Sequence, residues 1–257
     1  MRFDLTDKQW ASLQPLLPPT RQGGKQADDR KTINGILYVL KMGIPWGDLP
    51  SRYGPHTTCY NRLRRWQKTV YLAGSVSGTS SRISSHDLDD RQYEYKGTPG
   101  GSRGAKTGLS SDERVAAEAI GRSQGGRITK INAICDERGR LRRLLLTPGN
   151  RHDMIAVWEQ MNDSPPDVQT FISDKGYYSQ ELREELEAAG LQVITPARGT
   201  DDGFREHEKE LYKTRNLVER CFNTLKDNRR IATRCDKLAS VFQSFICIAA
   251  IKQWILI

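Results

Sequence analysis

The chain is 257 residues long, which is enough for one large domain or for a catalytic domain with a smaller companion. Its 40 Lys and Arg against 31 Asp and Glu give a formal charge of +9, which favours a polyanionic partner such as nucleic acid over an acidic small molecule. The one long apolar stretch, residues 241–257, spans only 17 residues and includes Gln243, Lys252 and Gln253, so it predicts a buried C-terminal helix and no membrane partner.

The N-terminal part of the chain has a helical pattern. Residues 5–19, LTDKQWASLQPLLPP, form a helical segment that ends in prolines. In residues 28–43, four apolar residues recur at i, i+3, i+4 and i+7, namely Ile33, Ile36, Leu37 and Leu40, and Gly43 ends the run. We predict that this second helix lies in a core.

A basic helix follows the turn-rich residues 44–56. Thr57 or Thr58 can cap it, and Tyr60, Leu63 and Trp66 can pack inward. Its cationic side chains then project outward, and they are Arg62, Arg64, Arg65 and Lys68. Two helices joined by a turn, the second of them basic, are typical of helix-turn-helix DNA contact. The alternative is a small helical bundle with a solvated basic face.

The middle of the chain separates two kinds of pattern. Residues 69–112 are rich in Ser, Gly and Thr without a sustained apolar period, which indicates a linker. Two alternating apolar runs in residues 126–149 then predict a hairpin about the turn 136–139. A strand at 168–174, a helix at 179–190, a strand at 191–197 and a basic helix at about 208–227 complete a mixed sheet flanked by helices.

Two carboxylates are the candidates for chemistry. Asp174 lies at the end of an apolar strand, where α/β sheets commonly present functional side chains, although a turn aspartate explains the same position. Glu219 lies in the middle of a helix beside Arg215 and Arg220, which an exposed ion pair worth about 0.3–0.5 kcal/mol also explains. Two such carboxylates from different elements could together hold Mg²⁺, which takes oxygen ligands.

Several motifs, taken together, resemble one protein family. Residues 212–226, YKTRNLVERCFNTLK, fit the pattern Y-x2-R-x3-E-x6-K, which resembles the signature of bacterial insertion-sequence transposases of the DDE class. Residues 227–245 resemble the insertion-sequence-five family of these enzymes. The segments AIGRSQGGRITKINAICDERG, LTPGNRHD and SDKGYYS occur in that family's order, and residues 46–68 resemble its N-terminal DNA-binding region. The resemblance covers roughly residues 1–68 and 113–250.

The resemblance implies a fold and a metal site. The fold is a ribonuclease-H-like α/β sheet flanked by helices, preceded by a small helix-turn-helix-like region. The site holds two Mg²⁺ ions, for which Mn²⁺ can substitute, with Asp174 as the second catalytic aspartate and Glu219 as the glutamate, both binding metal. The reaction is cleavage and strand transfer of double-stranded DNA at the element's inverted repeats and at a target site.

The resemblance also assigns DNA contacts. Tyr212, Arg215 and Lys226 match the family positions that hold DNA phosphates near the cut, a role that depends on charge and hydrogen-bond donors. Arg229, Arg230 and Arg234 extend that clamp, and a solvated basic face is the alternative for each of them.

One part of the family pattern is missing. The family's first catalytic aspartate stands in a strand ahead of GAK and GRS, and here that place is occupied by residues 92–108, QYEYKGTPGGSRGAKTG, which contain neither that aspartate nor the histidine that follows it. Asp89, Asp90 and Glu94 lie nearby in the sequence, but the residues around them do not resemble those around the family's first aspartate. Since both flanks fit the family, we hypothesise a reading-frame change between about residues 69 and 104.

The sequence therefore predicts a helical DNA-binding region at 1–68, an irregular linker at 69–112 and a transposase domain at 113–257, in a bacterial cytoplasmic, nucleoid-associated protein that forms a homodimer on DNA. The alternative is a catalytically inactive remnant that acts only as a DNA-binding or inhibitory protein. A third hypothesis is that the chain is an unrelated basic α/β protein, which requires every motif match to arise by chance.

Overall fold

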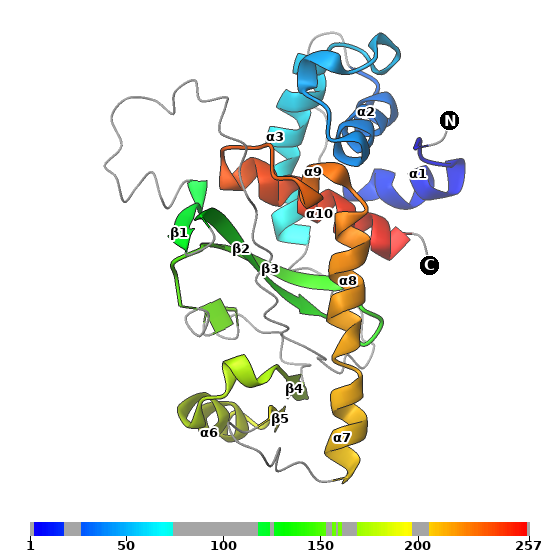
Figure 1. Cartoon of the computed structure of the whole chain (residues 1–257). Helices are drawn as coiled ribbons and strands as arrows, with labels where there is room; N and C mark the ends of the chain where they lie inside the picture. The colour runs from blue at the N-terminus through cyan, green and yellow to red at the C-terminus, as the bar shows by residue number, and fades with distance from the viewer. Residues whose placement is uncertain are drawn as a thin grey trace. The chain divides into compact units, whose positions relative to one another are not determined.

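A computed structural model of the chain describes residues 3–17, 27–73, 118–123, 126–152, 156–157, 159–160, 169–196 and 206–255. The chain divides into two compact units, whose helices and strands are labelled in Figure 1. The first unit contains residues 1–78, 97–118 and 225–257, and the second contains residues 79–96 and 119–224.

The first unit is helical in the part that the structure describes. Its α-helices are α1 (Asp7–Leu13), α2 (Asp29–Met42), α3 (His56–Ala73), α9 (Arg229–Ala232) and α10 (Ala239–Ile255). Its 3-10 turns are η1 (Gln14–Leu16), η2 (Trp46–Asp48) and η3 (Ser51–Tyr53).

Helix α2 is the core helix that the apolar spacing predicts. Asp28 caps its N-terminus by accepting a hydrogen bond from the N–H of Lys31 at 3.1 Å. Gly43 ends it in the left-handed conformation, with φ 68°. Its buried face carries all four predicted residues, which are Ile33, Ile36, Leu37 and Leu40. The prediction for this helix is confirmed.

Helix α3 differs from the sequence prediction at both ends. It begins at His56, because the N–H groups of Thr58 and Cys59 already bond to the carbonyl of Pro55, so neither threonine is its cap. It also continues to Ala73, past the predicted end at residue 68, since the chain has no glycine or proline until Gly74.

The inward face of α3 also differs in one residue. Cys59 is fully buried together with Leu63 and Trp66, as the helical period requires. Tyr60, which we predicted to pack inward, is only half-buried and lies edge-to-face on Trp46, with ring centroids 5.7 Å apart.

Helix α10 is the buried C-terminal helix that its apolar sequence predicts. It packs against α1, α2, α3 and α9 of the first unit. Phe245 and Ile246 are completely buried in it, and Val241 and Phe242 nearly so. Among the described residues, no helix is both long enough and apolar enough to cross a membrane.

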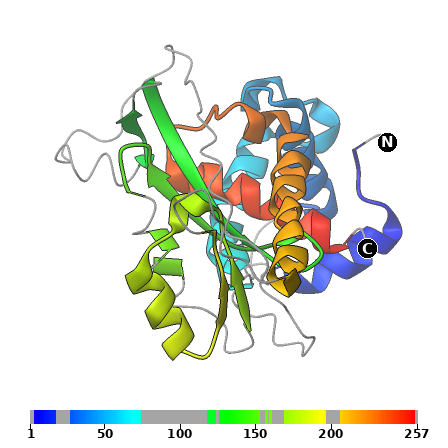
Figure 2. The ribbon, with the colours of Figure 1, turned by 60° about the horizontal axis from the view of Figure 1, so that its bottom comes forward.

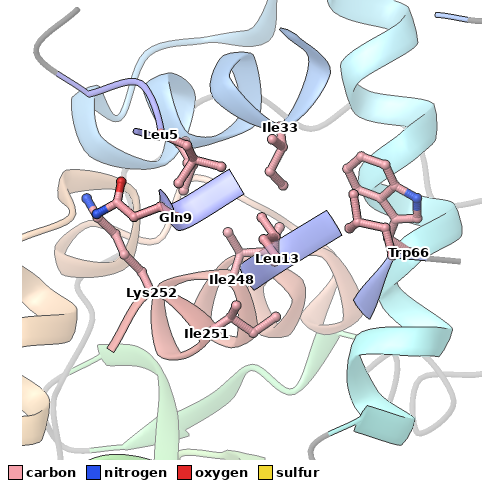
Figure 3. Close-up of a pocket in the computed structure, with 10 residues that line it drawn as sticks. Leu5, Gln9, Leu13, Ile33, Trp66, Ile248, Ile251 and Lys252 are labelled. Carbon is pink, nitrogen blue, oxygen red and sulfur yellow. The ribbon is translucent and has the colours of Figure 1, made fainter. Parts of the chain in front are cut away.

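A small apolar cavity of about 30 Å³ lies where α1, α2, α3 and α10 meet (Figure 3). Leu13, Ile33, Trp66 and Ile248 are among the side chains that line it. Gln9 and Lys252 also line the cavity, but its exposed lining is almost entirely apolar, and a buried water needs two or more polar partners. We therefore interpret the cavity as imperfect core packing.

The second unit contains a three-stranded antiparallel sheet, in the order β1 (Gly121–Ser123), β2 (Gly126–Cys135) and β3 (Leu141–Pro148). The β2–β3 hairpin, green in Figures 1 and 2, confirms the predicted one. Asp136 in its turn is completely buried and accepts hydrogen bonds from the N–H groups of Arg138 and Arg140 at 3.0 and 2.8 Å. The carboxylate of Asp136 therefore serves to hold the turn together.

The second sheet of this unit is parallel. Strands β4 (Thr170–Ile172) and β5 (Gln192–Ile194) are joined through η4 (Lys175–Tyr177) and α6 (Gln180–Ala188), and α7 (Glu206–Lys213) follows and packs on β5. Ser179 caps α6 and Gly190, with φ 86°, follows its end, as predicted. Leu182 and Leu186 of α6 bury against Phe171 and Val193 of the strands.

The compact units divide the chain at other points than the predicted domains. Residues 225–257, the end of the predicted transposase domain of residues 113–257, group with the N-terminal helices. The physical reason is α10, whose apolar surface is buried against the helices of the first unit. Helix α8 (Asn216–Lys226) contains the point at which the chain passes from one unit to the other.

Gly149, directly after β3, leaves no room for a side chain. A Cβ built on it would lie 2.0 Å from Cγ1 of Ile128. We expect Gly149→Ala to lower the free energy of unfolding by about 1–3 kcal/mol through overpacking, which corresponds to roughly 2–10 °C in the melting temperature. Circular dichroism during heating measures this. Gly176→Ala is the control, because no atom lies within 4 Å of its built Cβ, and equal melting temperatures for both variants would contradict the prediction.

Candidate functional site

Asp174 stands immediately beyond the β4–β5 ladder. The N–H of Ser173 still bonds to the carbonyl of Ile194 at 3.1 Å, so strand pairing reaches the residue before it. On the other side, Oδ1 of Asp174 accepts the N–H of Lys175 at 2.7 Å, and the N–H of Tyr177 donates to the Asp174 carbonyl at 2.9 Å. Hydrogen bonds thus hold the backbone before and after Asp174. Its side chain is partly exposed to solvent.

A pair of buried hydroxyl groups supports this strand end. Ser173 and Thr195 occupy equivalent positions after β4 and β5, and their oxygens lie 2.6 Å apart. Sequence reasoning missed this pair. Part of the signal was present, because each residue directly follows a short apolar strand and one helix joins the two strands, an order that favours parallel pairing; the register that brings the two hydroxyl groups together was not.

Glu219 lies in the first turn of α8 and is paired with Arg215. Nη2 of Arg215 lies 3.1 Å from Oε1 of Glu219, and the two side chains are 20% and 28% exposed. The same guanidinium sits over the ring of Tyr212, 5.8 Å from its centroid. Three of the predicted site residues therefore lie together beside the break between α7 and α8 at residues 214–215.

The predicted phosphate-binding residues further along the chain differ in their surroundings. Lys226, in the last turn of α8, is half-buried, and desolvation lowers the pKa of its ammonium group. Arg229, in α9, is exposed.

Arg230 is buried, unlike Arg229. Its Nε and Nη2 donate to the two carboxylate oxygens of Asp236 at 2.9 and 2.7 Å, and its Nη1 donates to the carbonyl of Ile44 at 2.7 Å. The guanidinium also lies over the ring of Phe245, at 4.8 Å from its centroid. This geometry occupies the guanidinium of Arg230, which we predicted to bind phosphate, inside the first unit.

Arg234 is buried in a similar way. Its Nη2 donates to the carbonyls of Glu118 and Lys237 at 2.6 and 2.9 Å, and its Nε donates to the carbonyl of Asp236 at 2.9 Å. Only 3% of the residue is exposed. Arg234, which we also predicted to bind phosphate, therefore fixes the turn between α9 and α10.

The three arginines of α3 also differ in burial. Arg62 is 8% exposed and pairs with Asp29 of α2, with Nη1 and Oδ1 3.0 Å apart. Arg64 and Arg65 are exposed, and Nη1 of Arg64 donates to the hydroxyl of Tyr60 at 3.4 Å. Only the latter two arginines are therefore accessible to a partner.

Two predicted metal ligands, Asp174 and Glu219, lie among the described residues. Asp174 and Glu219 belong to the same unit, and carboxylate oxygens are the ligands that Mg²⁺ prefers. Among the described residues, no group of three or more His, Cys, Asp or Glu is arranged to hold a metal ion. Asp89, Asp90 and Glu94 lie outside the described residues. The donor chemistry of Asp174 and Glu219 suits Mg²⁺.

Two protein families match parts of the chain. Residues 5–73 match the family described as "Putative transposase of IS4/5 family", and residues 101–251 match the family described as "Transposase DDE domain". The second match covers more than half of the chain and includes both Asp174 and Glu219.

Curated relatives agree with these families. A protein of Brucella ovis named "Putative transposase for insertion sequence element IS6501" is 30% identical over 131 residues, which cover 49% of this chain and 98% of the relative. The "Insertion element IS402 uncharacterized 16.2 kDa protein" of Burkholderia cepacia is 39% identical over 71 residues, 24% of this chain and 48% of the relative. No solved structure matches the chain.

The buried pair of Arg230 and Asp236 has a consequence for stability. Their side chains are 5% and 9% exposed, so Arg230→Ala leaves a buried carboxylate without its cation. We expect this variant to lower the free energy of unfolding by about 3–5 kcal/mol. Urea denaturation measures it.

Arg229→Ala is the matched control, because Arg229 is the exposed neighbour on the same helix. We expect it to change stability by less than about 0.5 kcal/mol. Similar urea midpoints for Arg229→Ala and Arg230→Ala would show that the buried pair does not stabilise the unit.

Proposed function

The chain belongs to the DDE transposases of insertion sequences, in the IS4/5 family, and we propose that it binds the inverted-repeat ends of such an element and cuts and rejoins DNA there. Asp174 and Glu219 are the catalytic carboxylates. The observation that carries the proposal is the arrangement at the α7–α8 break, where Glu219 is paired with Arg215 and Arg215 lies over Tyr212.

Asp174 and Glu219 are the metal ligands in this proposal. Members of this family use divalent metal ions, and two Mg²⁺ ions, or Mn²⁺ in their place, would supply Lewis acidity to the attacking and leaving oxygens. Asp174 suits this role because the β4–β5 ladder and the Lys175 N–H fix its position while its side chain still reaches the surface. Glu219 suits it because Arg215 orients its carboxylate.

The cations of the site bind DNA phosphates. Arg215 and Tyr212 lie beside Glu219, and we assign Lys226 and the exposed Arg229 to the same function. Phosphate contacts need charge and donors rather than base recognition. In the first unit, Arg64 and Arg65 of α3 contact the element's ends. The protein acts as a homodimer on paired ends, in the bacterial cytoplasm at the nucleoid.

We further propose that both sheets are parts of one ribonuclease-H-like fold. The order of an antiparallel hairpin, then a strand, a helix and a parallel strand supports this. So does Ile134 of β2, which packs against the apolar cluster around Phe171 of β4 and Val193 of β5.

A second candidate function has an observation in its favour. Residues 92–108 lack the family's first aspartate, and in the described part of the chain no group of three or more His, Cys, Asp or Glu is arranged to hold a metal ion. A transposase without its third ligand binds DNA and does not cut it. The alternative is therefore a DNA-binding remnant that competes with intact transposase for the same ends.

A nicking assay tests the proposed activity. The full chain is incubated with a supercoiled plasmid that carries the DNA flanking its own gene, with Mg²⁺ or Mn²⁺. We expect metal-dependent nicking that falls at least about 100-fold in Glu219→Gln and in Asp174→Asn, because each change removes a metal ligand. Gel electrophoresis of the plasmid measures the rate.

Glu184→Gln and Asp227→Asn are the controls, because both carboxylates are exposed and neither belongs to the site. We expect both to retain wild-type nicking. Retained binding to the flanking DNA with no nicking by any protein would support the remnant and contradict the enzyme.

A further inference from the structure

The exposed side of α3 has a defined composition. Cys59, Leu63 and Trp66 face the core, and the helical period puts Thr57, Asn61 and Arg64 on the opposite side, at i, i+4 and i+7. All three of the latter residues are exposed. We call this row of three side chains the α3 ridge.

The core fixes the direction in which the ridge points. Helix α3 packs on α2 and α10. The ion pair of Arg62 with Asp29 of α2 and the buried ring of Trp66 prevent rotation of α3 about its own axis. The three ridge residues are therefore presented together on a rigid helix, as a partner with a regular surface requires.

The chemistry of the ridge matches base edges better than phosphates. Arg makes paired hydrogen bonds to guanine O6 and N7, Asn makes them to adenine N6 and N7, and Thr contacts either base edges or the thymine methyl group. Thr and Asn side chains also contact phosphates, but only one of these three residues is charged, so the ridge lacks the density of cations that binding to the DNA backbone alone would favour.

We propose that the α3 ridge enters the major groove of duplex DNA and reads the sequence of the element's ends, with Asn61 on an adenine and Arg64 on a guanine. From Thr57 to Arg64 the helix rises about 10 Å, which corresponds to roughly three base pairs. This inference rests on the proposed function, because it assumes that the chain binds the DNA ends.

Neighbouring residues have supporting roles. The hydroxyl of Tyr60 accepts a hydrogen bond from Nη1 of Arg64, which reduces the number of conformers that Arg64 has to give up on binding. Arg65 is exposed about 100° around the helix from Arg64, at the side of the ridge, where a groove wall places phosphates. B-form DNA is the partner that fits, since the major groove of duplex RNA is too narrow for a helix.

Selection from a random-sequence duplex library, performed with the full chain, tests the proposal. We expect wild-type protein to enrich a motif in which an adenine and a guanine lie within about three adjacent base pairs. Asn61→Ala should lose preference at the adenine, and Arg64→Ala at the guanine, by about 5- to 100-fold at that position.

Arg65→Ala is the matched control on the same helix. It should weaken binding to all sequences about equally and reduce the dependence of affinity on salt concentration by about one unit of slope, while the selected motif stays unchanged. All three residues are exposed, so circular dichroism should show the wild-type fold for each variant.

The outcomes separate this inference from the proposed function. If wild type selects a motif that Asn61→Ala and Arg64→Ala both retain, the ridge does not read sequence, although the protein still binds DNA ends. If wild type binds no duplex DNA, the proposed function itself fails. Equal affinity for duplex RNA and duplex DNA also overturns the inference.

Discussion

The first unit depends on the buried guanidinium of Arg230. It bonds to Asp236 beside it and to the carbonyl of Ile44, which is 186 residues earlier in the chain. A buried cation is tolerated only where partners satisfy its donors. The position of α9 is therefore tied to the turn after α2, and α10, which follows, buries its apolar surface against the N-terminal helices. This contact makes one unit from the two ends of the chain.

The sequence predicted local structure well and long-range partners poorly. Apolar spacing identified α2, and the turn at Asp136 to Gly139 identified the β2–β3 hairpin, because both signals are local. The same reasoning assigned the C-terminal helix to the catalytic domain. The apolar sequence of a helix predicts that the helix is buried but does not identify the surface against which it packs. The packing of α10 on α3 therefore could not be predicted from the residues of α10.

The candidate site shows a related difference. Helical spacing alone predicts that Arg215 and Glu219 meet, and they do. The support of Asp174 by the hydroxyl pair of Ser173 and Thr195 depends on the register between β4 and β5, which the sequence leaves open.

Two of the arginines predicted to contact DNA are buried in ion pairs. Sequence reasoning treated each arginine of α3 and α9 as a DNA contact, but Arg62 and Arg230 are each paired with an aspartate inside the first unit. Each pair removes one positive and one negative charge, so the formal excess of +9 is unchanged and has to be carried by other residues. The electrostatic argument for a polyanionic partner therefore survives the burial of Arg62, Arg230 and Arg234, while the burial of Arg62 together with Leu63 and Trp66 determines which face of α3 is left to meet that partner.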